Sequence, residues 1–372
     1  MIYLDYTAHT PVCKQAIDAF LEAEANCLGN ANARHAAGIA TNQMMEEARD
    51  QIACLFHVQP DEIIFTSGAS ESNNTAIQGI VYANRHFGRH IITSPLEHPS
   101  VSGCLTALQE RGYEIDVLPI GADGQIDLDA LRRTLRPDTV LVTLCAVDSE
   151  LGVIQPVEKA SEIIREFPYC RLHMDATQAI GKIPTDFNWA DTVSLSGHKF
   201  GGITGSGLLY KKKEIEMEPL IHGGISTSLY RSGTPAVSLA VSLSAALEDA
   251  LTELDDRRQK VQVMNQYLRA ELLKRNIRIH SPLEAIPHIL NVGIDGIKGH
   301  VMRDRLNEHG VCVSVKSACS VENTPSRAIY AVTGNRRQAL ESWRISLSHL
   351  TTMDELKEFL ATLDIILKEE TK

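Results

Sequence analysis

The stretch Ser196-Gly197-His198-Lys199 follows the short apolar run Thr192–Leu195 and precedes a glycine-rich segment. Such a run indicates a buried strand, so the lysine falls where the strand ends. Burial disfavours the charged ammonium and lowers the pKa of a lysine, which suits a neutral amine that forms a Schiff base. A solvated turn lysine is the simpler alternative for this residue taken alone.

A second apolar run upstream ends in a carboxylate, within His173-Met174-Asp175-Ala176-Thr177-Gln178. A lysine and an aspartate at two successive strand ends match what pyridoxal phosphate requires. The lysine bonds to the aldehyde carbon, and the carboxylate keeps the ring nitrogen protonated so that the ring can accept electrons. Asp175 and Lys199 together therefore predict a site for this cofactor.

Strand-like and helical patterns alternate through the first two thirds of the chain. Strands are predicted at Glu62–Thr66, His90–Thr93, Glu114–Leu118, Val140–Leu144, Arg171–Met174, Thr192–Leu195 and Gly207–Tyr210. Helices are predicted between them, for example at Leu128–Thr134 and Glu158–Glu166. This alternation predicts an α/β fold with a mostly parallel seven-stranded sheet covered on both faces. Ligands of such sheets bind beyond the carboxyl ends of the strands, where Asp175 and Lys199 fall.

The pattern changes after about Thr234. Ser238–Tyr267 is strongly helical, and a capping-box pattern at Thr352 and Glu355 starts a last helix. Further apolar runs lie at His288–Val292, Val311–Val315 and Arg344–Leu347. We expect a large domain over residues 13–255 and a smaller α+β domain over residues 1–12 and 256–372.

The composition of the chain excludes several classes of protein. The 372 residues carry a net charge of −11, which argues against a surface that coats nucleic acid. The N-terminus lacks a secretory pattern, and no apolar run approaches the roughly 18–20 residues that span a bilayer. Eight cysteines without a CxxC pair favour free thiols over disulfides or a metal site. We expect a cytoplasmic protein with no metal and no direct nucleic-acid or membrane partner.

Four further features are candidates for function, each with a structural alternative. The small residues of Thr66–Asn74 follow a strand and open a helix, which suits a phosphate site or an ordinary helix cap. His98 follows another strand and is either catalytic or a satisfied loop residue. Arg344 in an apolar strand binds either a substrate carboxylate or a structural carboxylate. Cys319 lies in a polar run that predicts an exposed loop, where Lys316 favours its thiolate.

In their order along the chain these features resemble the pyridoxal-phosphate-dependent cysteine desulfurases of the NifS/IscS type, which have fold type I. The resemblance covers essentially the whole chain. The matching segments are Tyr3-Leu4-Asp5, Thr10-Pro11, Gly29-Asn30, His35, Phe65–Asn73, Glu97-His98, Gly152–Pro156, Asp175–Gln178, Ser196–Lys199, Arg231–Thr234, Ser317-Ala318-Cys319 and Arg344.

The resemblance implies a role for each matching residue. Lys199 would form the Schiff base, His98 would stack on the cofactor ring and assist proton transfer, and Cys319 would be the nucleophile. Further cofactor contacts would come from Ala69, Ser70, Ser149, Asp175, Gln178, Ser196, His198 and, from the other subunit of a homodimer, Thr234. Asn30, Ser149 and Arg344 would bind L-cysteine. The products would be L-alanine and a persulfide on Cys319, whose sulfur passes to a protein acceptor, either a tRNA sulfurtransferase or an Fe–S scaffold.

The chain also departs from the family pattern. Ser149 stands where the family usually has an asparagine, and Lys316 stands where a small residue is common. These departures suggest a branch (NifZ-like) that serves a tRNA-thiolating partner. The alternatives are another fold-type I enzyme, such as a selenocysteine lyase, a cysteine lyase or an aminotransferase, and a catalytically idle binding partner. A Rossmann dehydrogenase is disfavoured because no G-x-G-x-x-G follows the first strand.

Overall fold

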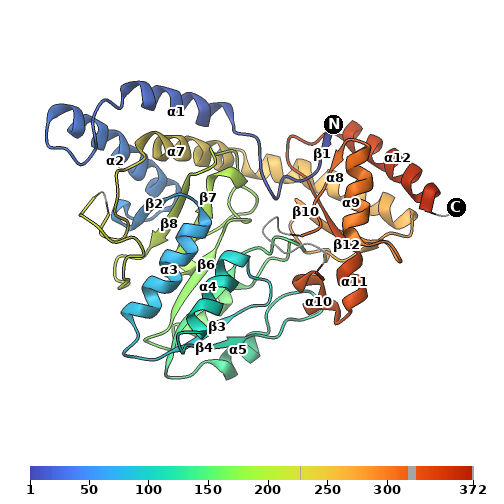
Figure 1. Cartoon of the computed structure of the whole chain (residues 1–372), viewed down its shortest axis with the longest axis horizontal. Coiled ribbons are helices and arrows are strands. Elements are labelled where there is room, and N and C mark those ends of the chain that lie inside the picture. The colour runs from blue at the N-terminus through green and yellow to red at the C-terminus, as the bar shows by residue number, and fades with distance from the viewer. Residues whose placement is uncertain (227, 317–323, 371–372) are drawn as a thin grey trace.

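The computed structural model describes residues 1–226, 228–316 and 324–370. Its main sheet has seven strands in the order β2-β8-β7-β6-β5-β3-β4 (Figure 1). Six of the seven strands run in the same direction and β8 runs opposite to them, so the predicted mostly parallel sheet is confirmed. The strands are β2 (Ile63–Thr66), β3 (His90–Thr93), β4 (Glu114–Val117), β5 (Thr139–Cys145), β6 (Arg171–Asp175), β7 (Thr192–Ser196) and β8 (Gly207–Lys211).

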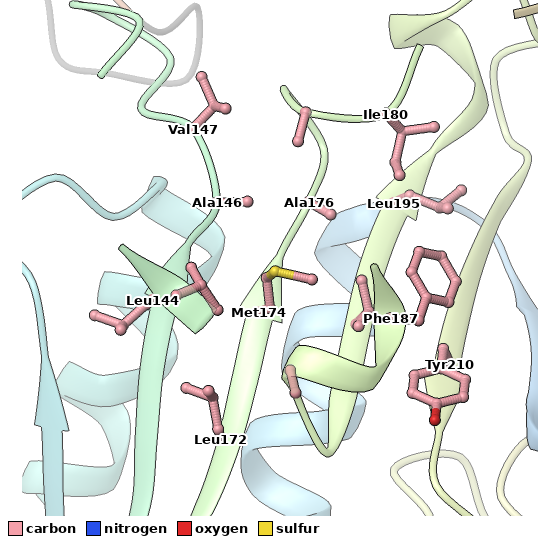
Figure 2. Close-up of a cluster of buried hydrophobic side chains, with 14 of the residues drawn as sticks. Leu144, Ala146, Val147, Leu172, Met174, Ala176, Ile180, Phe187, Leu195 and Tyr210 are labelled. Atoms are coloured by element: carbon pink, nitrogen blue, oxygen red, sulfur yellow. The ribbon is translucent and has the colours of Figure 1, made fainter. Parts of the chain in front are cut away.

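Two hydrophobic clusters cover the two faces of this sheet. Neighbouring residues of one strand face opposite sides, so Ile91 belongs to one cluster and Ile92 to the other. Figure 2 shows part of the larger cluster, where Leu144, Met174 and Leu195 come from three neighbouring strands. The helices of this part are α1 (Lys14–Asn26), α2 (Ala36–Phe56), α3 (Ala69–Ala83), α4 (Pro99–Gln109), α5 (Leu128–Thr134), α6 (Val157–Ile164) and α7 (Val237–Thr252). Burial on both faces explains why these strands read as continuous apolar runs.

The rest of the chain surrounds a separate core. Strands β9 (Arg278–Ile279), β10 (Ile289–Gly293) and β12 (Ser342–Ser346) form an antiparallel sheet, and β1 (Ile2–Tyr3) pairs with β11 (Val311–Cys312). Both chain ends lie on this side of the molecule (Figure 1). A third cluster, which includes Leu4, Trp343 and Phe359, holds these elements together. The helices here are α8 (Leu254–Lys274), α9 (Gly299–Glu308), α10 (Arg327–Thr333), α11 (Arg336–Glu341) and α12 (Met353–Glu370).

Most predicted elements differ from the observed ones by one or two residues at an end, and three of the differences change the kind or the length of an element. The helical stretch Ser238–Tyr267 is two helices, because α7 packs on the main sheet whereas α8 packs in the third cluster. A single straight helix could not face both cores, and the chain breaks at Glu253. The run Val311–Val315 is a strand only at its first two residues. Glu62 lies not in β2 but in a short 3-10 helix, η1 (Pro60–Glu62).

The capping box that opens the last helix is confirmed. The Thr352 N–H donates to Glu355 Oε2 at 2.8 Å, and the Glu355 N–H donates to Thr352 Oγ1 at 3.2 Å. Two other 3-10 helices are η2 (Phe187–Trp189) and η3 (Gly197–Lys199), of which the second carries the predicted Schiff-base lysine. Across the described ranges, none of the helices combines the length and apolarity needed to cross a membrane.

Candidate active site

A cavity of about 380 Å³ lies beyond the carboxyl ends of the central strands, where it meets the second part of the chain. Cys145, Asp175 and Ser196 end β5, β6 and β7 and line it, and Arg344 of β12 closes it from the other side. The predicted site residues that line this cavity are Ala69, Ser70, His98, Ser149, Asp175, Gln178, Ser196, His198, Lys199 and Arg344. Residues far apart in the sequence therefore meet in one place.

Lys199 ends the 3-10 turn η3, directly after β7. The turn is tight because a Cβ at Gly197 would overlap Ser206 Oγ, and one at Gly202 would come 2.8 Å from the Gly197 Cα. The Lys199 Nζ donates to the carbonyl oxygens of Thr7 and Ala8, each at 2.8 Å. The N-terminal segment thus holds the amine at the cavity wall.

Asp175 is buried and receives fixed hydrogen bonds on both oxygens. Asn73 Nδ2 donates to its Oδ2 at 2.8 Å, and the Thr177 N–H donates to its Oδ1 at 2.9 Å. The Asn73 Oδ1 must then accept, so His173 donates to it from Nε2, at 2.9 Å. Burial lowers the pKa of His173 to about 4, so this histidine is neutral. The two donors hold the Asp175 carboxyl group in one orientation at the cavity wall, where it can face the ring nitrogen of a bound cofactor.

His98 caps the N-terminus of α4 and is joined to Asp175 through two side chains. Its Nδ1 accepts from the Ser100 N–H at 3.1 Å and lies 2.8 Å from Ser100 Oγ. Asn73 Nδ2 also donates to Ser100 Oγ, at 2.9 Å. Burial is the main cause that lowers the pKa of His98, so the ring is neutral and carries its proton on Nε2. A neutral ring can stack on a flat cofactor and exchange a proton there.

The start of α3 forms a cradle suited to a phosphate. Gly68 has φ 146°, and a Cβ at this position would lie 3.2 Å from Ser196 Oγ. Only glycine therefore lets the backbone approach so closely, while Ala69 and Ser70 begin a helix whose first N–H groups could donate to a bound phosphate. Ser196 Oγ lies 2.9 Å from His198 Nδ1. Burial and the charges of Lys199, His9 and Lys182 lower the pKa of His198 to about 4.

Arg344 forms the structural ion pair that its sequence context allowed, and it also lines the cavity. It is 2% exposed, and its Nη2 pairs with Asp5 Oδ1 at 2.9 Å. Its Nη1 donates to the Ser149 carbonyl oxygen at 2.8 Å. It also lines the cavity, and its Nε has no hydrogen-bond partner in the described part of the chain. The structural ion pair thus orients a guanidinium that still faces the cavity.

Two predicted site residues do not line the cavity, and a third lies outside the described residues. Asn30 and Thr234 are exposed in this single chain and do not line it. Asn30 Oδ1 instead accepts from the Asn32 N–H at 2.9 Å. Cys319 lies outside the described residues. Lys316, on the near side of that segment, donates to the carbonyl oxygen of Thr324 at 2.9 Å.

The sequence analysis did not single out four residues that the structure places at or behind the site. Asn73 links Asp175 to His98, and the Thr7 carbonyl oxygen holds Lys199. Glu97 is buried and accepts from the N–H of Cys145, which lines the cavity, and Lys182 is buried and donates to Gln178. Asn73 stood in the quoted Thr66–Asn74 stretch. Glu97 stood in the quoted pair Glu97-His98. The contact of Thr7 with Lys199 joins distant segments, and Lys182 lies only four residues after Gln178 but in no quoted motif.

Taken together, the cavity fits pyridoxal phosphate. A glycine cradle lies beside Ser196 and His198, a fixed carboxylate faces the cavity at Asp175, and an amine faces it at Lys199. These are the groups for a phosphate, a ring nitrogen and an aldehyde carbon. Within the described ranges, no group of three or more His, Cys, Asp or Glu side chains is arranged to hold a metal ion.

Comparison with known proteins gives a consistent result. The Aminotransferase class-V family matches residues 2–359. The chain is 35% identical to a cysteine desulfurase IscS of Dictyoglomus turgidum, over 99% of this chain and 95% of that protein. A solved NifS-like protein superimposes with a TM-score of 0.93 at 33% identity, and covers 99% of both chains. The structure of SspA in complex with cysteine superimposes with a TM-score of 0.82 at 30% identity, covering 95% of this chain and all of that one.

Identity of this extent over nearly the full length, together with a cavity built for pyridoxal phosphate, places the chain in the aminotransferase class-V family, among the NifS/IscS cysteine desulfurases.

Proposed function

We propose that this protein is a cysteine desulfurase that converts L-cysteine to L-alanine and passes the sulfur through a persulfide on Cys319. The observation that carries the proposal is the juxtaposition of Lys199, Asp175 and Arg344 around one cavity. It is further supported by relatives named cysteine desulfurase and by the related SspA, which was solved with cysteine.

Each side chain has a distinct task in this reaction. Bound pyridoxal phosphate would supply an electron sink for the pair left when the Cα proton of cysteine departs. The Lys199 amine removes that proton, and Asp175 holds the proton on the ring nitrogen. Arg344 binds the substrate carboxylate with the guanidinium that Asp5 and Ser149 orient. The Cys319 thiolate attacks the substrate sulfur, the Cβ–Sγ bond breaks with its electron pair left on carbon, and Cβ and then Cα each take a proton to give alanine.

The same proposal includes an assembly and a place in the cell. Leu28, Ile39 and Ile225 are 88%, 58% and 83% exposed in the single chain, which is costly for large apolar side chains in water. We infer a cytoplasmic homodimer that covers them and in which Thr234 serves the cavity of the other subunit. We also infer a division into a large domain, residues 13–255, and a small domain, residues 1–12 and 256–372.

We further propose that the sulfur acceptor is a tRNA sulfurtransferase, as the departures at Ser149 and Lys316 suggest, and that an Fe–S scaffold is the alternative. Purified protein loaded with sulfur from L-cysteine should pass it to the sulfurtransferase. Transfer to the scaffold alone would refute this choice of acceptor without affecting the desulfurase activity.

The experiment that tests the activity measures alanine and trapped persulfide from L-cysteine. Cys319→Ala should keep the cofactor and its spectral response to cysteine but lose the persulfide and sulfur transfer. Cys54→Ala is the matched control, because Cys54 is a free and exposed cysteine. Normal sulfur transfer by Cys319→Ala, or its loss in Cys54→Ala, would contradict the assignment of Cys319.

A further inference from the structure

Lys182 is a buried lysine that the reaction described above does not use. It directly follows Gly181, which has a φ of 72°. Its side chain is 6% exposed, and its Nζ donates to Gln178 Oε1 at 3.0 Å. Within the described ranges it forms no ion pair, and Gln178 is its one hydrogen-bond partner. Burying an ammonium group that has no carboxylate partner costs free energy, so we ask what function a buried lysine has at this position.

The charges around Lys182 are positive. Burial is the main cause that lowers its pKa, to about 7, and Lys199 and Arg344 lower it further. Lys182 in turn lowers the pKa of His198 and of the buried His288. A cluster of positive groups beside a cavity is unfavourable when the cavity is empty and favourable when it holds an anion. An anionic ligand on this side of the cavity would therefore be stabilised.

The hydrogen bonds of Gln178 show how Lys182 acts on the cavity. A carbonyl oxygen can only accept, so Thr7 O must face Gln178 Nε2, which it does at 3.1 Å. The amide oxygen Oε1 then lies on the other side, where it accepts from the Lys182 Nζ at 3.0 Å. The two contacts together fix the orientation of the Gln178 amide. Because Gln178 lines the cavity, its second Nε2–H is available to a group bound there. The same Thr7 oxygen accepts from Lys199, which joins Lys182 to Lys199 through three contacts.

We propose that Lys182 is a positioning residue, which holds the Gln178 amide with its N–H toward the cavity and so favours an anionic oxygen of the bound cofactor. The proposal rests on the proposed function, since it assumes that pyridoxal phosphate occupies the cavity. Without Lys182 only the Thr7 contact holds the amide, so its orientation is less fixed and its second Nε2–H is less available to that anionic oxygen.

The test measures cofactor binding and its absorption spectrum, not turnover. Purified protein is stripped of cofactor and titrated with pyridoxal phosphate, for wild type, Lys182→Met, Gln178→Leu and the double variant. We expect Lys182→Met to raise the dissociation constant at least about tenfold, as expected for the loss of one hydrogen bond to a charged group, and to shift the visible absorption maximum. Because Lys182 acts through Gln178, the double variant should bind no more weakly than the weaker single variant.

Lys211→Met is the matched control for the loss of a buried lysine. Lys211 is 2% exposed, and its Nζ donates to three backbone carbonyl oxygens away from the cavity. Lys211→Met should lose stability yet keep the cofactor affinity and spectrum. If Lys182→Met does not fold, Lys182→Gln takes its place.

Unchanged affinity and spectrum in the folded Lys182 variant would overturn the inference, and so would fully additive effects with Gln178→Leu. A wild-type protein that binds no pyridoxal phosphate would overturn the proposed function itself. The two failures are thus distinguishable.

Discussion

Glu97→Gln should stabilise the protein at neutral pH, by an amount that grows with pH. Glu97 is fully buried, and its Oε1 accepts from Ser94 Oγ at 2.7 Å and from the Cys145 N–H at 2.9 Å. Its Oε2 has no hydrogen-bond partner among the described residues. A protonated carboxyl suits this position, and a glutamine amide reproduces it, because its oxygen can keep both hydrogen bonds.

The magnitude follows from the pKa of this carboxyl. Burial, reinforced by the charge of Asp175, raises the pKa of Glu97 from 4.5 to about 8. Above pH 4.5 the unfolded chain releases this proton while the folded protein keeps it, so the free energy of unfolding falls as pH rises to 8. At about 1.4 kcal/mol per pH unit, the loss reaches about 3 kcal/mol at pH 7. Glutamine does not titrate, so the variant avoids this loss.

The assay is guanidinium unfolding of both proteins without cofactor at pH 5, 6, 7 and 8. All other groups titrate alike in the two proteins, so the difference in unfolding free energy isolates Glu97. We expect a difference near zero at pH 5 that increases steadily toward pH 8. A difference that stays constant with pH would refute the argument that this carboxyl is protonated in the folded protein.

Two further predictions concern the cofactor site. Lys199→Ala should remove the visible absorption of lysine-bound pyridoxal phosphate and abolish alanine formation; an absorption that persists in the purified variant would show that another amine holds the cofactor. Gly207→Ala should destabilise the protein by about 1–3 kcal/mol and weaken cofactor binding, because a Cβ there would come 2.7 Å from the Gly68 N. Gly103→Ala, which meets nothing within 4 Å, is the control for thermal unfolding and should not be destabilised.

The local pattern of apolar residues was enough to predict the strands of the main sheet. All seven predicted strands are present, and β3 (His90–Thr93) has the predicted limits. Parallel strands buried on both faces must be apolar along their length, so each one is visible in the sequence without knowledge of its neighbours. The break between α7 and α8 was missed because it depends on which core each helix packs against, and neither glycine nor proline marks it.

The candidate site also has a part that the sequence predicted and a part that it did not. Lys199 and Asp175 could be placed at strand ends from sequence, because a chemical group directly after an apolar run is a local feature. The residues that these groups contact could not be predicted from the sequence. Asp5 pairs with Arg344 across 339 residues, and Asn73 reaches Asp175 across 102. Such contacts depend on how the two parts of the chain fold together.

The order of residues alone established the α/β architecture, the strand-end lysine and aspartate, and the family resemblance, because each is carried by short segments. Only the folded chain decided the protonation of Glu97, the neutral state of His98 and the orientation of the Gln178 amide by Lys182. The reason is physical: burial and charge act through space, so a side chain acquires its pKa and its hydrogen-bonding role from neighbours that only folding supplies.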